Sequence, residues 1–575
     1  MKTFPTSEVL KKSLPFGLAD IIVILGTLVL LALISRIGAG FLVSFKPPDI
    51  IPTVDLDPRN LPYYACRSTL RMFIALFFSL LFTLIYGYIA SHSRRAERVL
   101  IPLLDILQSV PVLGFLSITV TGFIALFPGS LLGLECASIF AIFTSQVWNM
   151  TFSFYQSLRT IPRELEEAVT LYHLSGWEKF IKLEVPSAMI GLVWNGMMSF
   201  GGGWFFVAAS EAISVLNQDY TLPGIGSYVT QAIVQENLSA LGWAFLTIGI
   251  IIIAVDQVFW RPIIAWSDKF RMEQSQSAES PESWLLDLLT TARIPRLIGE
   301  FLTPVTDTIN RFLSTITPRH NHYKSDLSES KNDLIYNFIL LAIIGLLIAL
   351  GLHFILTTVG ITEVLKTFSL GLLTLLRVTG LLIFATLIWT PIGVAIGFNP
   401  KLARFLQPVV QFLASFPANF IFPFATLFFI KFDISINWGS ILLMSLGAQW
   451  YILFNSIAGA QTIPTDLKEM ANSLGLKGWQ KWRKLIIPGI FSAWVTGGVT
   501  ASGGAWNASI VSEIVSWGST ILTADGLGSY IAEATATGDW ARITLGVGMM
   551  SLFVVGINRI FWRRLYELAV TKYHI

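Results

Sequence analysis

Charged residues are scarce in this chain of 575 residues. Asp, Glu, Lys and Arg make up 13% of it, against 54% for the hydrophobic residues. A soluble protein of this length would carry about twice that charged fraction. The stretch 338–356 (FILLAIIGLLIALGLHFIL) also lacks the polar face that a helix at the surface of a soluble protein needs. The composition therefore excludes a large soluble helical protein and indicates a protein that crosses a membrane many times.

Other features are also missing, and each absence removes a class of function. The two cysteines, Cys66 and Cys136, give neither a disulfide framework nor a metal-binding spacing. The net charge of +3 is too small to indicate binding to nucleic acid. The phosphate-binding pattern G-x-x-x-x-G-K-[ST] does not occur, so we do not expect the chain to hydrolyse ATP by that route.

Long apolar runs recur from one end of the sequence to the other, and each bilayer crossing takes roughly 20 residues. The first run, 21–37, is not followed by a small-residue cleavage site, so we expect it to be retained as a span. We predict an all-α membrane protein with about twelve spans, six in each half. The predicted spans lie near 20–43, 67–91, 100–127, 132–155, 187–213, 238–262, 335–356, 366–396, 403–430, 437–458, 489–515 and 541–562.

The two halves resemble each other. Arg71 aligns with Arg377 at an offset of 306, and Glu211 aligns with Glu513 at an offset of 302. Six spans separate the copies, so both copies enter the membrane in the same direction and form parallel repeats. We predict a first repeat over residues 1–263, a cytoplasmic linker over 264–334 and a second repeat over 335–575.

Lys and Arg residues in short loops predict the orientation of the chain. In the twelve-span prediction they fall on one side, and the opposite loops, 216–237 and 516–540, contain few of them. Both termini are therefore expected in the cytoplasm. The basic residues on that side include Lys11, Lys12, Arg94, Arg95, Arg98, Lys179, Lys182, Lys401, Arg404, Lys481, Arg483, Lys484, Arg563, Arg564 and Lys572.

The predicted linker is charged and rich in serine. Its segment 284–314 has amphipathic character, interrupted by Pro295 and Pro304. Such a segment suits a position in the membrane interface, in contact with lipid, where it would tether the two halves. A loosely ordered linker is the alternative.

A polar segment interrupts the apolar runs at the same place in each half. The first polar segment is 161–186, and the second polar segment is 463–488. A proline near the start of each suits the first turn of a short helix, and acidic residues follow where the helix dipole favours them. We predict a short amphipathic helix nearly parallel to the membrane, joined rigidly to a span on each side. Such a segment can pass the movement of a cytoplasmic partner into the helix bundle.

The polar segments resemble the coupling motif in the permease subunits of bacterial ABC importers. That motif reads Glu-Ala-Ala, three residues, Gly, nine residues, then Ile-x-Leu-Pro. The second polar segment fits it with Glu469, Ala471 and Gly475, ending at Pro488. The first fits with Glu167-Ala168 and ends at Pro186, but His173 occupies the glycine position.

The resemblance extends beyond the polar segments. Ser210-Glu211 followed by Gly224-Ile225-Gly226 is similar to the nitrate, sulfonate and taurine branch of these permeases, and so is Leu70-Arg71. The same patterns recur in the second half, as Ser512-Glu513, Gly526-Leu527-Gly528 and Leu376-Arg377. The resemblance therefore covers both halves.

The resemblance implies a type I ABC importer permease with two permease domains fused in one chain, in the bacterial inner membrane. Such a chain is a transport component and not an enzyme; it holds no cofactor, and ATP and Mg belong to two separate ATP-binding subunits. A periplasmic or lipid-anchored solute-binding protein is also implied. The departure at His173 allows the two segments to couple unequally. The residues implied in contact with the ATPases are Glu164, Glu167, Ala168, His173, Gly176, Asp466, Glu469, Ala471, Gly475 and Gly478.

Charged side chains within spans are candidates for the translocation path, because each costs about 2.5–3.5 kcal/mol to insert. Glu211 and Glu513 follow glycine-rich stretches in the fifth span of each half, and Arg71 and Arg377 lie near the outer ends of theirs. Pairing of these glutamates with the arginines is the alternative to a place in the pore. Further path candidates are Trp204, Trp506 and Asn507, with Asn149, Trp194, Asn195, Trp450 and Asn455 as weaker ones.

Two other functional classes fit part of the pattern. A twelve-span secondary transporter would also have parallel halves, but it should show acids or broken helices at midplane rather than two docking motifs. A channel or membrane scaffold gives no reason for repeated polar segments. The branch resembled imports small anions such as sulfonates, nitrate and bicarbonate, and some other solutes, and the path candidates do not choose among them.

Overall fold

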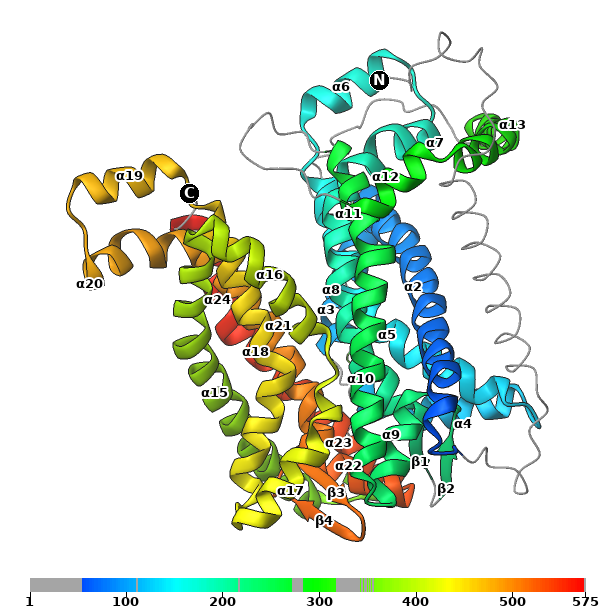
Figure 1. Cartoon of the computed structure of the whole chain (residues 1–575), viewed down its shortest axis with the longest axis vertical. Coiled ribbons are helices and arrows are strands. Elements are labelled where there is room, and N and C mark those ends of the chain that lie inside the picture. The colour runs from blue at the N-terminus through cyan, green and yellow to red at the C-terminus, as the bar shows by residue number, and fades with distance from the viewer. Residues whose placement is uncertain are drawn as a thin grey trace. The chain divides into compact units, whose positions relative to one another are not determined.

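The structure of the chain is a computed structural model, shown in Figure 1. The predicted spans near 20–43 and 335–356 lie largely outside the residues that it describes, as do Lys11 and Lys12. The described residues are 54–109, 112–215, 218–270, 283–316 and 356–572, with the isolated positions 342, 345, 349, 351 and 353.

The described part of the first half is almost entirely helical, as its apolar runs predict. Where the prediction has a loop, over 216–237, the chain instead forms a β-hairpin and a short helix. The elements are η2 (Pro58–Asn60), α2 (Leu61–His92), α3 (Arg94–Ser109), η3 (Val112–Phe115), α4 (Leu116–Leu126), α5 (Leu132–Arg159), α6 (Arg163–Leu171), α7 (Gly176–Lys179), η4 (Phe180–Glu184), α8 (Val185–Glu211), β1 (Ala212–Val215), β2 (Gln218–Thr221), α9 (Ile225–Val234), α10 (Leu238–Val255), η5 (Asp256–Trp260), α11 (Arg261–Ser267) and η6 (Asp268–Phe270).

The second half repeats this order of elements. Most bounds differ by the same offsets that align the sequences, so the duplication extends to the backbone. Its elements are α15 (Ile361–Phe398), α16 (Pro400–Ser415), η7 (Ala418–Phe420), α17 (Phe422–Phe432), α18 (Ile436–Thr462), α19 (Thr465–Ser473), α20 (Gly478–Lys481), η8 (Trp482–Ile486), α21 (Ile487–Ser512), β3 (Ile514–Trp517), β4 (Thr520–Thr523), α22 (Leu527–Thr537), α23 (Trp540–Ile557), η9 (Asn558–Trp562) and α24 (Arg563–Lys572).

Among the described residues, six helical stretches are long and apolar enough to cross a membrane. Two further helices, α5 and α8, occupy the predicted spans 132–155 and 187–213, and they correspond to α18 and α21 in the second half. The chain is thus a multi-pass membrane protein, and the predicted all-α class is confirmed. The six stretches are Pro58–His92, Leu238–Phe270, Ile361–Phe398, Ile436–Thr462, Gly478–Ser512 and Trp540–Ala569.

The third predicted span of each half differs from the prediction. Instead of one helix over 403–430, α16 ends at Ser415 and α17 begins at Phe422. Pro417 causes the break, because it supplies no N–H to a continuing helix and keeps the preceding Phe416 extended, at ψ 125°. In the first half, α3 and α4 are separated in the same place.

Each half also contains a two-stranded antiparallel β-hairpin, directly after its fifth long helix. Ala212 pairs with Thr221 in the first, and Ile514 pairs with Thr523 in the second. The turn of the second contains Gly518 at φ 55°, a backbone conformation that favours glycine. The hairpin returns the chain to the end of the long helix, where the GIGSY and GLGSY sequences then begin a short helix.

The linker forms two helices within the part that the structure describes, α12 (Trp284–Thr291) and α13 (Arg293–Ile316). The expected interruption at Pro304 does not occur, because α13 continues through that proline.

The chain forms two compact units, each of which is described by itself. One contains residues 156–195, 253–270 and 283–316. The other contains most of 54–155, 196–252 and 356–572, and its largest apolar core includes Leu381, Met444 and Trp506.

Candidate functional site

The two polar segments have the same order of elements. A nine-residue helix (α6 or α19) is followed by a tight turn, a short helix (α7 or α20) and a π-helical turn that leads into the next long helix. The turn holds His173 at φ 50° in one segment and Gly475 at φ 67° in the other. Both residues are therefore left-handed, which glycine adopts without cost and histidine does not.

Backbone hydrogen bonds close the turn identically in both copies. Leu174 N donates to Val169 O at 3.2 Å, and Leu476 N donates to Ala471 O at 2.9 Å. A bond over this separation, with a left-handed residue before the donor, is the Schellman arrangement that ends many helices. The glycine of the coupling motif is thus a helix-ending position, and His173 keeps its conformation.

The predicted ATPase contacts lie mostly at the surface of these segments. Glu164 and Glu167 are exposed on α6, Asp466 and Glu469 are exposed on α19, and Ala471 is buried. Gly176 and Gly478 begin the short helices. Large apolar side chains stand beside the acids, and they are 67–79% exposed: Leu171, Tyr172, Leu474 and Trp479. Apolar groups exposed next to charges are typical of an interaction surface.

Side-chain contacts within the first polar segment fix its shape. Ser175 caps α7 by accepting from Glu178 N, while the Glu178 carboxylate accepts from Ser175 N at 3.0 Å. That backbone bond, helped by Lys182, lowers the pKa of Glu178. Lys179 is buried and pairs with Glu166 at 3.4 Å and with Glu184 at 3.5 Å.

The second polar segment reaches the same shape through other contacts. Lys477, at the position of Ser175, makes no side-chain cap. Lys468 and Lys481 lie over the ring of Phe398, at 5.0 and 5.7 Å from its centroid. Ala471 is 2% exposed and packs in an apolar cluster with Ala460 and neighbouring residues of α18 and α21.

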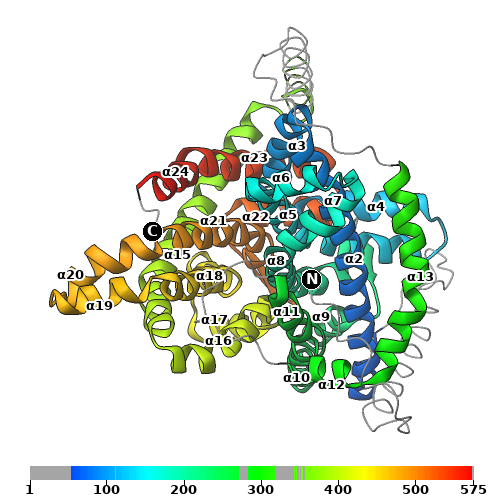
Figure 2. The same cartoon turned by 90° about the horizontal axis from the view of Figure 1, so that it is seen from above.

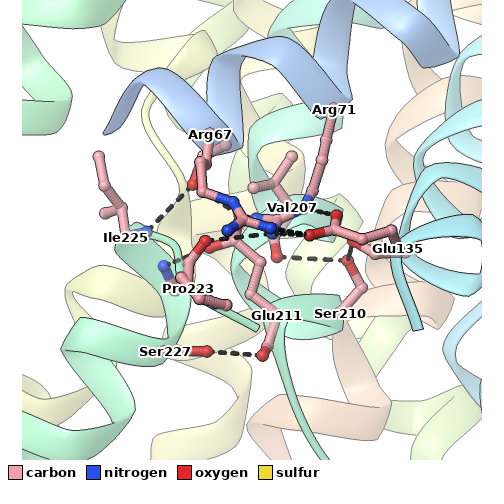
Figure 3. A network of polar contacts seen from close by, with 12 residues as sticks. Arg67, Arg71, Glu135, Val207, Ser210, Glu211, Pro223, Ile225 and Ser227 are labelled. Carbon is pink, nitrogen blue, oxygen red and sulfur yellow. Dashed lines mark hydrogen bonds and ion pairs between the residues drawn. The ribbon is translucent and has the colours of Figure 1, made fainter. Parts of the chain in front are cut away.

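A buried ion network lies in the first half, among helices α2, α5 and α8. Figure 3 shows Arg67 and Arg71 of α2 between Glu135 of α5 and Glu211 of α8. Arg71 donates to Glu135 Oε2 and to Glu211 Oε1, each at 2.5 Å, and Arg67 pairs with Glu135. All four side chains are at most 2% exposed, so each charge is compensated by another within the protein.

The glycine pair of the GIGSY sequence makes room for this network. Gly226 N donates to Glu211 Oε2 at 2.7 Å. A Cβ atom at Gly224 would collide with the same carboxylate. At Gly526 it would collide with the Glu513 carboxylate, to which Gly528 N donates at 2.7 Å. The glycines therefore allow the backbone to approach a buried acid closely.

The second half keeps one of the three ion pairs of this network and has a neutral residue where Glu135 forms the other two. Arg377 donates to Glu513 at 2.9 Å, as Arg71 does to Glu211. At the position of Glu135 stands Asn437, whose side-chain oxygen accepts from Arg377 at 2.7 Å. The position of Arg67 is occupied by Leu373. One acid and one base are thus lost together, and the network stays neutral.

The seven path candidates fall into three groups. Arg71, Glu211, Arg377 and Glu513 lie in the buried networks. Trp204 and Trp506 are 2% and 1% exposed; Trp204 packs on Phe200, and Trp506 stacks on Phe553 at a centroid distance of 6.0 Å. Asn507 lines a cavity.

That cavity, of about 140 Å³, is lined by corresponding helices of both halves. Gly201 and Gly202 of α8 face it, and so do their counterparts Gly503 and Gly504 of α21. Its described lining contains no charged side chain. The polar lining side chains are Gln108, Thr144, Ser145, Asn149, Ser415, Tyr451, Thr500 and Asn507.

Sequence reasoning missed several of these residues. Glu135 escaped notice although it is an acid inside a predicted span, which is the signal that should have found it. Tyr451 also faces the cavity and was overlooked beside Trp450. Among the described residues, no group of three or more His, Cys, Asp or Glu could hold a metal ion.

Fold and site together define a multi-pass membrane protein of two parallel helical repeats. Each repeat has a polar segment with the same helix-ending turn, and a buried acid beside a glycine pair. The family model for binding-protein-dependent transport system inner membrane components matches residues 63–259 and 388–565. The chain belongs to this family and contains its domain twice.

Several permeases are similar to the chain. A putative aliphatic sulfonates transport permease of Bacillus subtilis is 26% identical over 185 residues, covering 31% of this chain and 63% of the relative. A bicarbonate transport system permease of Synechococcus elongatus is 29% identical over 150 residues, covering 26% and 51%. A nitrate import permease of the same species is 28% identical over 168 residues, covering 29% and 55%. The chain thus spans between half and two thirds of each relative's length.

Proposed function

We propose that this chain supplies both transmembrane domains of an ATP-driven importer for a small anion. Its two polar segments receive two separate ATP-binding subunits on the cytoplasmic side, where both termini also lie. Those subunits bind ATP and Mg, and this chain itself needs no cofactor. A solute-binding protein outside delivers the solute to the bundle. The bundle then moves the solute across the membrane by alternating access.

The repeated geometry of the polar segments carries this proposal. In each polar segment, an exposed acid, Glu167 or Glu469, lies beside exposed apolar side chains. We call the two short helices of each segment with the turn between them, 163–179 and 465–481, the helical elbow. Each elbow continues through a π-helical turn into a long helix, so a push on the elbow reaches the bundle without an intervening flexible loop. The proposed contacts are Glu164, Glu167, Ala168, His173 and Gly176, with Asp466, Glu469, Ala471, Gly475 and Gly478 in the second segment.

The cavity supports a small solute as cargo. Its volume of about 140 Å³ is well below the roughly 300–1,000 Å³ of pockets for drug-sized ligands. Amide and hydroxyl groups such as those of Asn149 and Tyr451 can hold an anion by hydrogen bonds without a fixed positive charge. Sulfonate, bicarbonate and nitrate, the solutes in the names of its relatives, are all small anions of this kind.

Purification and reconstitution test the proposal. The tagged chain, isolated from its native membranes, should retain an ATP-binding subunit. The complex in proteoliposomes, with the solute-binding protein, should take up labelled nitrate, bicarbonate or ethanesulfonate only when ATP is present. Uptake driven by a proton or sodium gradient without ATP would instead make the chain a secondary transporter.

Charge reversal at the elbows locates the docking surface. Glu469→Lys should detach the ATP-binding subunit or reduce ATP-driven uptake at least tenfold, because it places a cation where the partner meets an acid. Lys572→Glu, near the C-terminal end of α24 and outside both polar segments, is a control charge reversal. Normal retention of the subunit together with normal uptake in Glu469→Lys would overturn the assignment of this surface.

A further inference from the structure

Helix α13 carries a stripe of large apolar side chains that no described residue covers. The members recur at intervals of four, four, three and four residues, which keeps them on one face of a helix. Their exposed fractions run from 50% to 79%: Phe301, Val305, Ile309, Phe312 and Ile316. A continuous apolar stripe of this length is far too exposed for a helix surrounded by water.

The opposite face of α13 contacts the first polar segment. Asn310 Oδ1 accepts from the indole N–H of Trp177 at 3.0 Å, and α13 packs beside α7. Figures 1 and 2 show α13 following α12 and passing α7. One face of α13 thus contacts the first polar segment. The other face, with Val305 and Ile309, points away from that segment.

The neighbouring residues place α13 at the level of a membrane surface. Helix α11 continues the span 238–270 and contacts α12, which leads into α13. At the end of that span the Lys269 ammonium lies over the Trp266 ring, 4.0 Å from its centroid, and α12 begins with Trp284, which is 59% exposed. Tryptophan and lysine at the end of a span mark the boundary between acyl chains and headgroups.

We propose that α13 is a membrane-surface anchor that lies with its apolar stripe in the lipid and holds the first polar segment through Asn310. The occupant of the stripe is the bilayer of this multi-pass protein, because α11, at the end of a span that crosses the same bilayer, contacts α12, and α12 leads into α13. An amphipathic helix of this kind buries its apolar face at the boundary of headgroups and acyl chains. The description of the polar segment as an ATPase-docking element rests on the proposed function, but the anchoring does not.

The consequence is an asymmetry between the two docking elements. Trp479, the counterpart of Trp177, is 71% exposed, and its indole has no hydrogen-bond partner among the described residues. The first segment is therefore tethered to the membrane surface, while the second is held by the helix bundle alone.

A fluorescent label tests the depth of the stripe. The full chain, with Cys66 and Cys136 replaced by Ala, receives one cysteine, labelled with an environment-sensitive dye, at Val305 or at Asp307 on the other face. In nanodiscs of equal parts phosphatidylcholine and phosphatidylglycerol, the label at 305 should emit to the blue of the label at 307. Spin-labelled lipid should quench the label at 305 strongly, and iodide should quench mainly the label at 307.

Two results would overturn the anchor. Equal iodide quenching at both positions would leave the stripe in water. A label at 305 protected from iodide but insensitive to spin-labelled lipid would show that protein, either a partner or a second copy, covers the stripe.

Amide exchange tests the tether without measuring transport. Asn310→Ala should speed exchange in α7 by roughly threefold to tenfold, the range expected for one lost hydrogen bond. The matched helix α20 should not change, and neither should α7 in the control Thr303→Ala, whose side chain bonds only its own helix. Unchanged exchange in α7 would contradict the tether. Because neither experiment involves ATP or solute, their outcomes are independent of the proposed function.

Discussion

The two halves of the chain build the same backbone from different interactions. The buried network of the first half uses two arginines and two glutamates, and that of the second uses Arg377, Glu513 and the neutral Asn437. In both, the sum of the buried charges is zero. The comparison teaches that the duplicated fold requires the balance of charge and the pairing of Arg71 or Arg377 with a glutamate, and not the additional ion pair.

The polar segments teach the same lesson at the surface. Lys179 is paired with acids in the first segment, whereas its counterpart Lys481 shares the ring of Phe398 with Lys468. Burial lowers the pKa of Lys468, because loss of hydration disfavours the charged ammonium. The helix-ending turn is common to both copies. The duplication therefore preserves this turn and not the side-chain contacts around it.

The largest predicted effect comes from breaking the charge balance of the first network. Glu135→Asn leaves Arg67 without its acid, which costs about 3–5 kcal/mol of stability. Arg67→Leu leaves the network with one negative charge in excess, although Glu135 keeps Arg71, and should also destabilise the protein. The double change copies the composition of the second network, Asn437 and Leu373, and should cost clearly less than the sum of the single changes. Unfolding of the three variants in detergent with increasing denaturant measures the loss of stability in each.

If the double change cost as much stability as the two single changes together, the fold would not depend on the balance of the buried charges. The change Arg71→Leu provides the comparison, because Arg71 serves Glu135 and Glu211 at once. No neutral substitute for it exists at the corresponding position, where Arg377 is retained, so its loss should cost at least as much as either single change.

A smaller effect distinguishes the two helix-ending turns. His173→Gly should stabilise the first turn by about 1 kcal/mol, since glycine occupies the left-handed region without the steric penalty of a side chain. Gly475→His should destabilise the second turn by a similar amount. Amide exchange at Leu174 and Leu476, whose N–H groups close the turns, measures both changes. Equal protection in the original and exchanged turns would mean that another contact sets the conformation.

Much of this architecture is predictable from sequence because duplication makes it visible twice. Matching residues such as Glu211 and Glu513, or Gly224 and Gly526, stand out by their fixed offset, and they mark both buried networks. Glu135 and Asn437 do not match in type, so the repeat comparison hides them although they occupy the same place. The sequence offers the pairing of Glu211 and Glu513 with the arginines as an alternative, and the structure has it. That Glu135 meets Arg67 and Arg71 of another helix is a property of packing, which the sequence does not encode locally.

The broken third span and the hairpins show a second limit. An apolar run over 403–430 fulfils the length criterion for a span, and hydropathy alone does not reveal the break at Pro417. The hairpin signal was present, because Gly518-Ser519 separates two short runs of β-branched residues. The prediction nevertheless has only a loop over 516–540.

The smallest predicted effect concerns the cap that only the first segment has. The Glu178 carboxylate accepts from Ser175 N, and its pKa is lowered, so it binds protons more weakly in the folded than in the unfolded segment. Its contribution to stability is therefore present above the ordinary pKa of glutamate, about 4.3, and is lost as pH falls through the lowered value. Exchange protection of α7, corrected for the intrinsic rate, should decrease over that acidic range. Protection of α20, which has Gln480 at the same position, should stay level, and Glu178→Gln should remove the pH dependence from α7. A parallel loss in both helices would assign the effect to general acid unfolding instead of the cap.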